Sequence, residues 1–250
     1  MEESKELTVN GKGNDLSLPS GIDATKYGVD MGEEDIIVPR LSLLQPTSKI
    51  EGAGKFYFTL TKELFDTIDM VVFSNQRGRV MFDPDMSKQE TICGSSNRSE
   101  PSPRFDPPQA PTCVECKFSK RGYSEEVLVS GRTVNKYCSE TNALRCMFVD
   151  TLFPFIFVGR RTSLQPINEF LSYMQYECVK NKRPLCCFPV RMTSKMVTKP
   201  NQKYYVPVLE RRGMIEKEEF MVMMNKYATY DVEKTFEEEA KGGNDEDAPF

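Results

Sequence analysis

Short apolar runs separated by polar, turn-forming residues dominate the chain from about residue 36 to residue 213. Runs of this length that are rich in β-branched and aromatic residues are typical of strands. They predict strands at 36–45, 54–60, 143–150 and 153–160, and a strand pair at 185–197 and 203–213 joined by the turn TKPNQ. The run 68–82 predicts either a hairpin or one long bent strand, broken at Asn75 to Gly78.

Two other segments have apolar residues at helical spacing. In 163–180 a serine precedes Ile167, Phe170 and Met174, which predicts a capped helix. The segment 214–240 predicts a second helix that packs on the barrel or forms a dimer contact. Many short strands with one or two helices predict a mainly β fold, and we favour a Greek-key barrel of the OB-fold type. A plain β-sandwich is the alternative.

The apolar pattern is absent at both ends and in one internal stretch. Residues 1–34 predict a disordered acidic arm, and residues 231–250 predict a disordered acidic tail. Residues 35–230 should then form one OB-fold-like domain, with a cysteine-rich insertion at 83–140. Because a structureless loop of that length is unusual in a compact domain, something other than a hydrophobic core must order the insertion.

The insertion contains a candidate metal site. Cys113 and Cys116 form a CxxC pair, whose spacing suits tetrahedral zinc. Cys93 and Cys138 complete a four-thiolate set, with Cys146 as a rival for the fourth place. A structural zinc ion would supply folding energy that the polar insertion cannot obtain from burial, and a closed site of this kind leaves no position for catalysis. The alternatives are chance loop thiols or a redox pair. We expect three further cysteines to lie in the core: Cys178, Cys186 and Cys187.

The composition argues against an enzyme. The chain has no histidine, no GxxxxGK[ST] loop and no GxGxxG after a strand. A magnesium nuclease site could be suggested from four acids, but their positions at strand ends favour surface turns: Asp66, Asp69, Asp83 and Asp85. We therefore expect no catalytic residue.

The net charge of −4 conceals a strong asymmetry. Residues 1–35 and residues 231–250 each carry −6, which leaves the body between them at +8. This arrangement fits a polyanion-binding body, although acidic ends can also serve only as solvating segments. No apolar run approaches the roughly 20 residues that span a bilayer, and the acidic N-terminus is unlike a secretory signal. We therefore expect a cytoplasmic protein, whose eight cysteines are thiols or metal ligands.

The body interleaves aromatic and basic residues along its predicted strands. Bases stack on aromatic side chains for about 1–3 kcal/mol each while Lys and Arg follow the phosphates, so such surfaces bind single-stranded nucleic acid with little sequence preference. Arg77 and Arg79 also flank a glycine that would let the backbone approach a ligand. The predicted binding residues are Lys55, Tyr57, Arg77, Arg79, Arg160, Arg161, Arg191, Lys195, Lys199, Lys203, Tyr204 and Tyr205.

Alternation along a strand must divide the aromatic residues between two faces. We expect Tyr57 to face outward, with Phe56 and Phe58 buried. Tyr204 and Tyr205 should likewise divide, one facing inward and the other outward.

The last residues, NDEDAPF, resemble the acidic tip of bacterial and phage single-stranded DNA-binding proteins, which end in acids, a proline and a terminal phenylalanine. The matching residues are Asp245, Glu246, Asp247, Pro249 and Phe250. Ala248 stands where that tip has a larger aliphatic residue, and the linker lacks the long Gly/Gln-rich tract. A second resemblance, to phage-encoded proteins similar to OB-fold single-strand binders, covers about 35–215 and is clearest in DIIVPRLSLLQPTSKIEGAGKF and KYYVPVLE.

These resemblances imply a single-stranded DNA-binding protein of phage replication, recombination or repair, in the host cytoplasm. From the charges we expect the tail to fold back on the body until DNA displaces it. The freed tip would then offer Phe250 to replication or recombination proteins. Two other functions fit the sequence: a zinc-ribbon RNA-binding or transcription factor, and a structural interaction protein whose body binds no nucleic acid.

Overall fold

The computed structural model describes residues 38–85, 90–103, 105, 107–120, 122–200 and 202–228. The predicted arm 1–34 and tail 231–250 lie outside these residues. The strands are β1 (Arg40–Leu43), β2 (Phe56–Phe58), β3 (Leu64–Phe65), β4 (Ile68–Phe82), β5 (Thr91–Ser95), β6 (Glu125–Val129), β7 (Arg132–Lys136), β8 (Ser139–Phe148), β9 (Pro154–Arg160), β10 (Pro189–Lys199) and β11 (Gln202–Arg211). The α-helices are α1 (Leu164–Asn181) and α2 (Lys217–Ala228). Single 3-10 turns are η3 (Lys117–Ser119), η4 (Arg161–Ser163) and η5 (Leu185–Cys187).

Nine strands of the described chain form one sheet in the order β11-β10-β4-β8-β9-β1-β2-β3, with β5 paired to β4, and β6 and β7 form a separate hairpin. Neighbouring strands are antiparallel except β1 and β9, which are parallel. In the sheet, β4, β8 and β9 lie next to one another in that order. After α1 the chain returns as β10, which lies beside β4 on its other side. This is a Greek key, as the sequence predicted.

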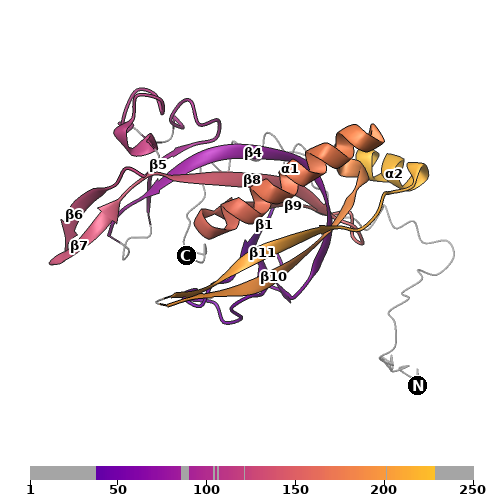
Figure 1. Cartoon of the computed structure of the whole chain (residues 1–250), viewed down its shortest axis with the longest axis horizontal. Coiled ribbons are helices and arrows are strands. Elements are labelled where there is room, and N and C mark those ends of the chain that lie inside the picture. The colour runs from indigo at the N-terminus through magenta and orange to yellow at the C-terminus, as the bar shows by residue number, and fades with distance from the viewer. Residues whose placement is uncertain are drawn as a thin grey trace, which may run out of the picture. The chain divides into compact units, whose positions relative to one another are not determined.

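The sheet curls into a half-barrel (Figure 1). Phe56 of β2 and Met192 of β10 belong to one core cluster, although five positions in the sheet order separate their strands. The edge strand β11 also returns to the segment after β1, where the Gln45 side chain donates to the Tyr205 carbonyl at 3.0 Å and accepts from the Tyr205 N–H at 2.9 Å. The main strands therefore form one curled sheet, and the alternative of two facing sheets is wrong.

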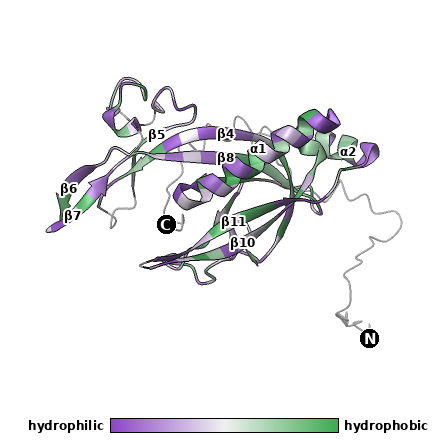
Figure 2. Cartoon of the chain, in the orientation of Figure 1, coloured by the Kyte–Doolittle hydropathy of each residue, from purple (hydrophilic) through white to green (hydrophobic). Residues whose placement is uncertain are grey.

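Helix α1 covers the inside of the curl. Its apolar residues recur at helical spacing, and Ile167, Phe170 and Met174 are buried in the main core cluster. Gly159 of β9 lets the helix approach closely, because a Cβ there would overlap Cδ1 of Ile167. Figure 2 shows hydrophobic and hydrophilic residues alternating along this helix. Ser163 occupies the predicted cap position but its side chain makes no capping hydrogen bond, since the 3-10 turn η4 leads directly into the helix.

Helix α2 packs on the opposite face of the sheet. Met223 is buried against Val71 and Met147, and the Tyr227 ring stacks on Phe73 at 3.7 Å between centroids and 3° between planes. Of the two roles considered for this segment, packing on the sheet is the one observed. Among the described residues, no helix is long and apolar enough to cross a membrane.

Strand β4 is one 15-residue strand and not a hairpin. Its irregularity lies between Val72 and Ser74, where the register with β8 shifts, so the strand bends at a bulge. It then continues through Asn75 to Gly78, where a break was expected. Its last residues pair with β5 and lead into the cysteine-rich insertion.

Candidate nucleic-acid interface

The curled sheet has an inner face, which α1 covers, and an outer face. Val190 and Met192 belong to the core under α1, so Arg191 between them lies on the outer face. The same alternation along β10 gives Lys195 and Lys199 outer positions, and both residues are exposed. One edge of the sheet therefore presents a row of cations on its outer face.

The turn between β10 and β11 adds an aromatic ring to that row. The Lys199 ammonium lies 5.6 Å from the ring centroid of Tyr204, which faces outward by its register with β10. Tyr205 instead packs against the main core and on Gly54, where a Cβ would lie 2.5 Å from a ring carbon of Tyr205. The expected division of the two tyrosines is confirmed. Lys203 is exposed but lies on the inner side.

The end of β9 carries two further cation–aromatic pairs. The Arg160 guanidinium lies 5.2 Å from the ring centroid of Phe82, and the Arg161 guanidinium 5.4 Å from that of Tyr137. Such pairs hold a guanidinium over a ring face by electrostatic attraction. Sequence reasoning found the two arginines but missed Phe82 and Tyr137. Their partnership depends on strand pairing between distant segments, which no local pattern reveals.

Arg191 is held by a bidentate ion pair. Its guanidinium donates to both carboxylate oxygens of Asp69 at 2.8 and 2.6 Å, and the hydrogen bond lowers the pKa of Asp69 below its ordinary value. Lys55 likewise pairs with Asp66 at 3.3 Å. These contacts leave Arg191 and Lys55 less available to a phosphate than Lys195 or Lys199.

The carboxylates considered for a magnesium site do not gather. Asp69 and Asp66 are engaged as described, and the Asp85 N–H donates to Oδ1 of Asp83 at 2.8 Å, as in a surface turn. Over the described part of the chain, no group of three or more Cys, Asp or Glu side chains is placed to hold a metal ion.

Two expectations for this surface are wrong. Tyr57 is only 6% exposed and the phenylalanines beside it are also buried, because both faces of β2 are covered. Its ring therefore cannot stack on a base in this conformation. Gly78 does not open the backbone to a ligand, since a Cβ there would lie 2.6 Å from the Ser95 carbonyl oxygen. Instead, the absence of a side chain at Gly78 lets strand β5 pack closely against β4.

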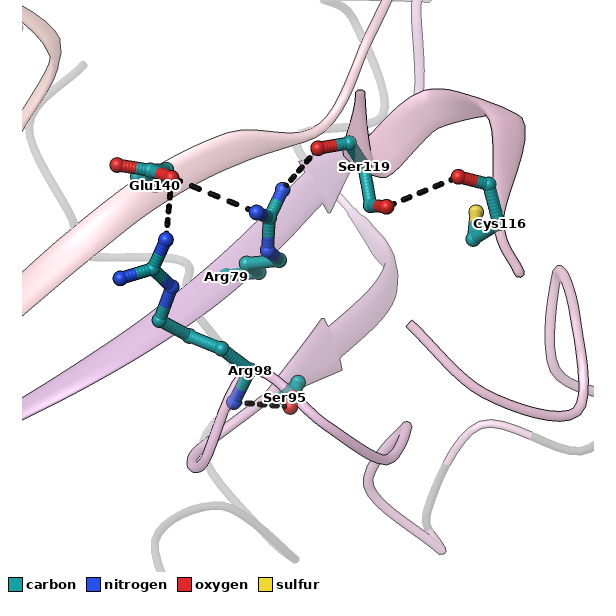
Figure 3. A network of polar contacts seen from close by, with 6 residues as sticks. All are labelled: Arg79, Ser95, Arg98, Cys116, Ser119 and Glu140. Carbon is teal, nitrogen blue, oxygen red and sulfur yellow. Dashed lines mark hydrogen bonds and ion pairs between the residues drawn. The ribbon is translucent and has the colours of Figure 1, made fainter. Parts of the chain in front are cut away.

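Arg79 is also committed to structure (Figure 3). Its Nη1 donates to the Ser119 carbonyl at 2.7 Å and its Nη2 pairs with Glu140 at 3.4 Å. Arg98 meets the same carboxylate at 2.7 Å, and the Ser119 hydroxyl donates to the Cys116 carbonyl at 2.9 Å. With its side chain only 13% exposed, Arg79 joins β4 to the insertion and offers little surface to a ligand.

The predicted binding residues therefore do not form one surface. Arg77 is exposed but lies on the inner face, since in the register of β4 with β8 it stands opposite Asn142. Asn142 is buried, accepts a hydrogen bond from Asn75 and donates one to Asn168 of α1. This asparagine chain was also missed by sequence reasoning. The residues that share the outer face or its rim are Arg160, Arg161, Arg191, Lys195, Lys199 and Tyr204.

The four cysteines named for zinc lie around one small cavity. Cys93, Cys113, Cys116 and Cys138 line it together with Arg79, and its volume is about 20 Å³. Burial raises the pKa of Cys93, and raises that of Cys138 to about 11.

The remaining cysteines lie elsewhere. Cys146, the rival fourth ligand, is buried in the main core, where burial also raises its thiol pKa. Cys187 belongs to the same core, and Cys178 packs against it. Cys186 lies in the cluster beneath α2. The expected core positions are confirmed for Cys186 and Cys187, whereas Cys178 is half-buried at the edge of the core.

The acids and the terminal Phe250 of the tail lie outside the described residues. One family model matches residues 13–246 and is described as Pam3 phage gp34-like protein. No curated protein and no solved structure matches the chain. Because the family match covers nearly the whole sequence, the chain belongs to the Pam3 phage gp34-like protein family.

Proposed function

We propose that the protein binds single-stranded DNA during phage replication, recombination or repair, on the outer face of an OB-type barrel. The observation that carries the proposal is the connectivity of the barrel. Apart from the inserted strands β5 to β7, strands β4, β8, β9, β10 and β11 follow one another as the five strands of a Greek-key barrel, with α1 between the third and the fourth. β4 is long and bulged and pairs with both β8 and β10.

An OB-fold binds oligonucleotides on the face of its second and third strands, between the loops that join strands 1 to 2 and strands 4 to 5. In this chain those strands are β8 and β9. The first loop is the cysteine-rich insertion. The second is the turn between β10 and β11, which is flanked by Lys199 of β10 and Tyr204 of β11. In this proposal the cation–aromatic pairs at the end of β9 and beside the β10–β11 turn contribute to the binding face.

The chemistry of this face suits unpaired nucleotides. Arg160 over Phe82, Arg161 over Tyr137 and Lys199 over Tyr204 each combine a phosphate-binding cation with a ring. A flexible single strand can place its bases on such rings and its phosphates near the cations. A duplex hides its base faces and would gain only the charge term.

The acidic tail supports a regulated version of the same function. Helix α2 ends at Ala228 on the outer face, with Tyr227 stacked on β4. The tail follows this helix in the sequence, and its charge of −6 opposes that of the basic body. In this proposal the tail competes with DNA, and the displaced tip, Asp245 to Phe250, recruits replication or recombination proteins. The role is binding and not catalysis.

Quenching of tyrosine fluorescence by oligo(dT) tests the proposal, since the chain has no tryptophan. We expect saturable binding that weakens steeply with salt. The double substitution Arg161→Ala/Lys199→Ala should lower the salt slope by about 2, or about 1 for each lost phosphate contact. Arg183→Ala removes an exposed cation at the end of α1 and serves as the matched control.

The outcomes separate the competing functions. No binding of oligo(dT) in dilute buffer would refute the proposal and favour a structural interaction protein. Tighter binding of RNA or duplex would favour the zinc-ribbon RNA-binding or transcription factor. Deletion of residues 242–250 should tighten DNA binding at low salt, and an unchanged affinity would exclude competition by the tail.

A further inference from the structure

The segment between β4 and β8 has little hydrophobic burial to hold it in place. Among its described residues, the buried hydrophobic ones are Cys93, Cys113 and Phe118. The β6–β7 hairpin contributes no buried side chain, since its residues are either half-buried or exposed. A two-stranded hairpin is marginally stable by itself, so the segment needs another source of order.

Four thiols from three separate stretches meet at the centre of this segment. Cys93 comes from β5, Cys113 and Cys116 from one turn, and Cys138 from the residue before β8. The cavity between them, about 20 Å³, has room for one water-sized sphere. It can therefore take a single ion, whereas an iron–sulfur cluster is much larger.

The surrounding groups suit a negatively charged metal centre. Four thiolates around Zn²⁺ carry a net charge of −2, and Arg79 lines the same cavity. The Nε of Arg79 is buried without a hydrogen-bond partner, so it lacks an acceptor. Backbone groups of Gln109 and Gly94 lie near the Cys93 sulfur, in positions to hydrogen-bond it. Donors of this kind orient and stabilise metal-bound thiolates.

The turn that carries the CxxC pair is fixed by its backbone. The Cys113 N–H donates to the Ser99 carbonyl at 2.8 Å, and the Cys116 carbonyl accepts from the Ser119 N–H at 3.1 Å and from its hydroxyl at 2.9 Å. Arg79 also holds Ser119. The CxxC turn is thus held to the backbone at Ser99 and, through Ser119, to Arg79 of β4.

We propose that Cys93, Cys113, Cys116 and Cys138 bind one zinc ion in a closed tetrahedral site. An all-sulfur set selects zinc among the common divalent ions. The four side chains as they stand in this structure are not placed to hold a metal ion. Each sulfur turns about a single side-chain bond, however, so thiols that line one cavity can be re-aimed at one ion. With four protein ligands the ion is structural, and it cross-links β5, the CxxC turn and the start of β8. This site does not depend on the nucleic-acid proposal.

Metal analysis of the full-length protein, purified without chelator, tests the site. We expect about one zinc per chain, and Co²⁺ exchanged for zinc should give the thiolate-to-metal charge-transfer band and the visible bands of tetrahedral sulfur coordination. Cys113→Ser and Cys138→Ser should each lose most of the zinc. Cys178→Ser, which alters a thiol outside the cavity, is the matched control and should keep it.

Far-UV circular dichroism identifies any variant that fails to fold, and the Co²⁺ spectrum of the unmodified protein supplies a result that needs no variant. Limited proteolysis should cut within 90–138 after chelation and leave the sheet intact. The proposal is overturned by a folded protein that contains no zinc and gives no cobalt–thiolate band, by iron in place of zinc, or by a disulfide between Cys113 and Cys116. Equal zinc loss in Cys178→Ser would also overturn it.

Discussion

The curled sheet and the cysteine-rich segment between β4 and β8 are stabilised in different ways. Among the residues that the structure describes, eighteen buried ones form the core cluster inside the curl. The cluster of the cysteine segment has three buried residues, Met81, Cys93 and Phe118, and the first belongs to β4. Burial alone can account for the order of the sheet, because each buried large side chain contributes about 1.5–3 kcal/mol. Burial alone cannot account for the order of the cysteine-rich segment, which has some fifty residues. Polar contacts and thiols gather there instead.

Removing one aromatic ring from each region gives the largest expected contrast. Phe155 is fully buried in the sheet core, so Phe155→Ala should lower the free energy of unfolding of the sheet by about 3–5 kcal/mol. Phe118→Ala should leave the main denaturant transition nearly unchanged and instead increase hydrogen exchange within 90–138. If both substitutions lower the same transition equally, the two regions unfold as one unit and the contrast is wrong.

A smaller effect is expected where α1 meets the sheet. Gly159→Ala introduces a Cβ that overlaps Cδ1 of Ile167, and overpacking of this kind costs about 1–3 kcal/mol. Ile167→Val removes that Cδ1, so the double variant should be less destabilised than the sum of the two single variants. Denaturant unfolding of all three variants measures this coupling. Simple additivity would show that the helix yields without strain.

The smallest effect concerns the ion pair of Asp69 and Arg191 at the edge of the sheet. The folded-state pKa of Asp69 is lowered from 3.8 by the hydrogen bond from Arg191. Its contribution to stability is therefore present above about pH 4 and is lost as the pH falls through the lower, folded-state value. Asp69→Asn should be slightly less stable than the unmodified protein at pH 6 in thermal unfolding, and the difference should shrink as the pH falls below about 4. A constant difference across this range would exclude the ion pair as its cause.

Local pattern predicted most elements of the sheet but not their long-range pairing. The predicted strands at 143–150 and 153–160 correspond to β8 and β9, and the turn TKPNQ joins β10 to β11 as expected. The parallel pairing of β1 with β9 and the return of β11 to Gln45 join residues more than a hundred positions apart. Periodicity within a window carries no information about such contacts.

The sequence pattern grouped some residues that lie together in the structure and misplaced others. The grouping of Cys138 with the CxxC pair follows from its position just before β8, whereas Cys146 lies further along the strand and faces the core. Alternation failed for Tyr57 because it assumes that one face of a strand is open. Both faces of β2 are covered. The hairpin of β6 and β7 was missed because its charged residues mask a weak alternating pattern.

The contact between Gln45 and Tyr205 has a consequence for self-association. β11 is the last strand of the sheet order, and an unpaired strand edge is a template on which a second chain can add. The Gln45 amide occupies one donor and one acceptor of that edge, and Pro207, two residues further on, has no N–H to offer. These features disfavour the addition of a second chain along β11.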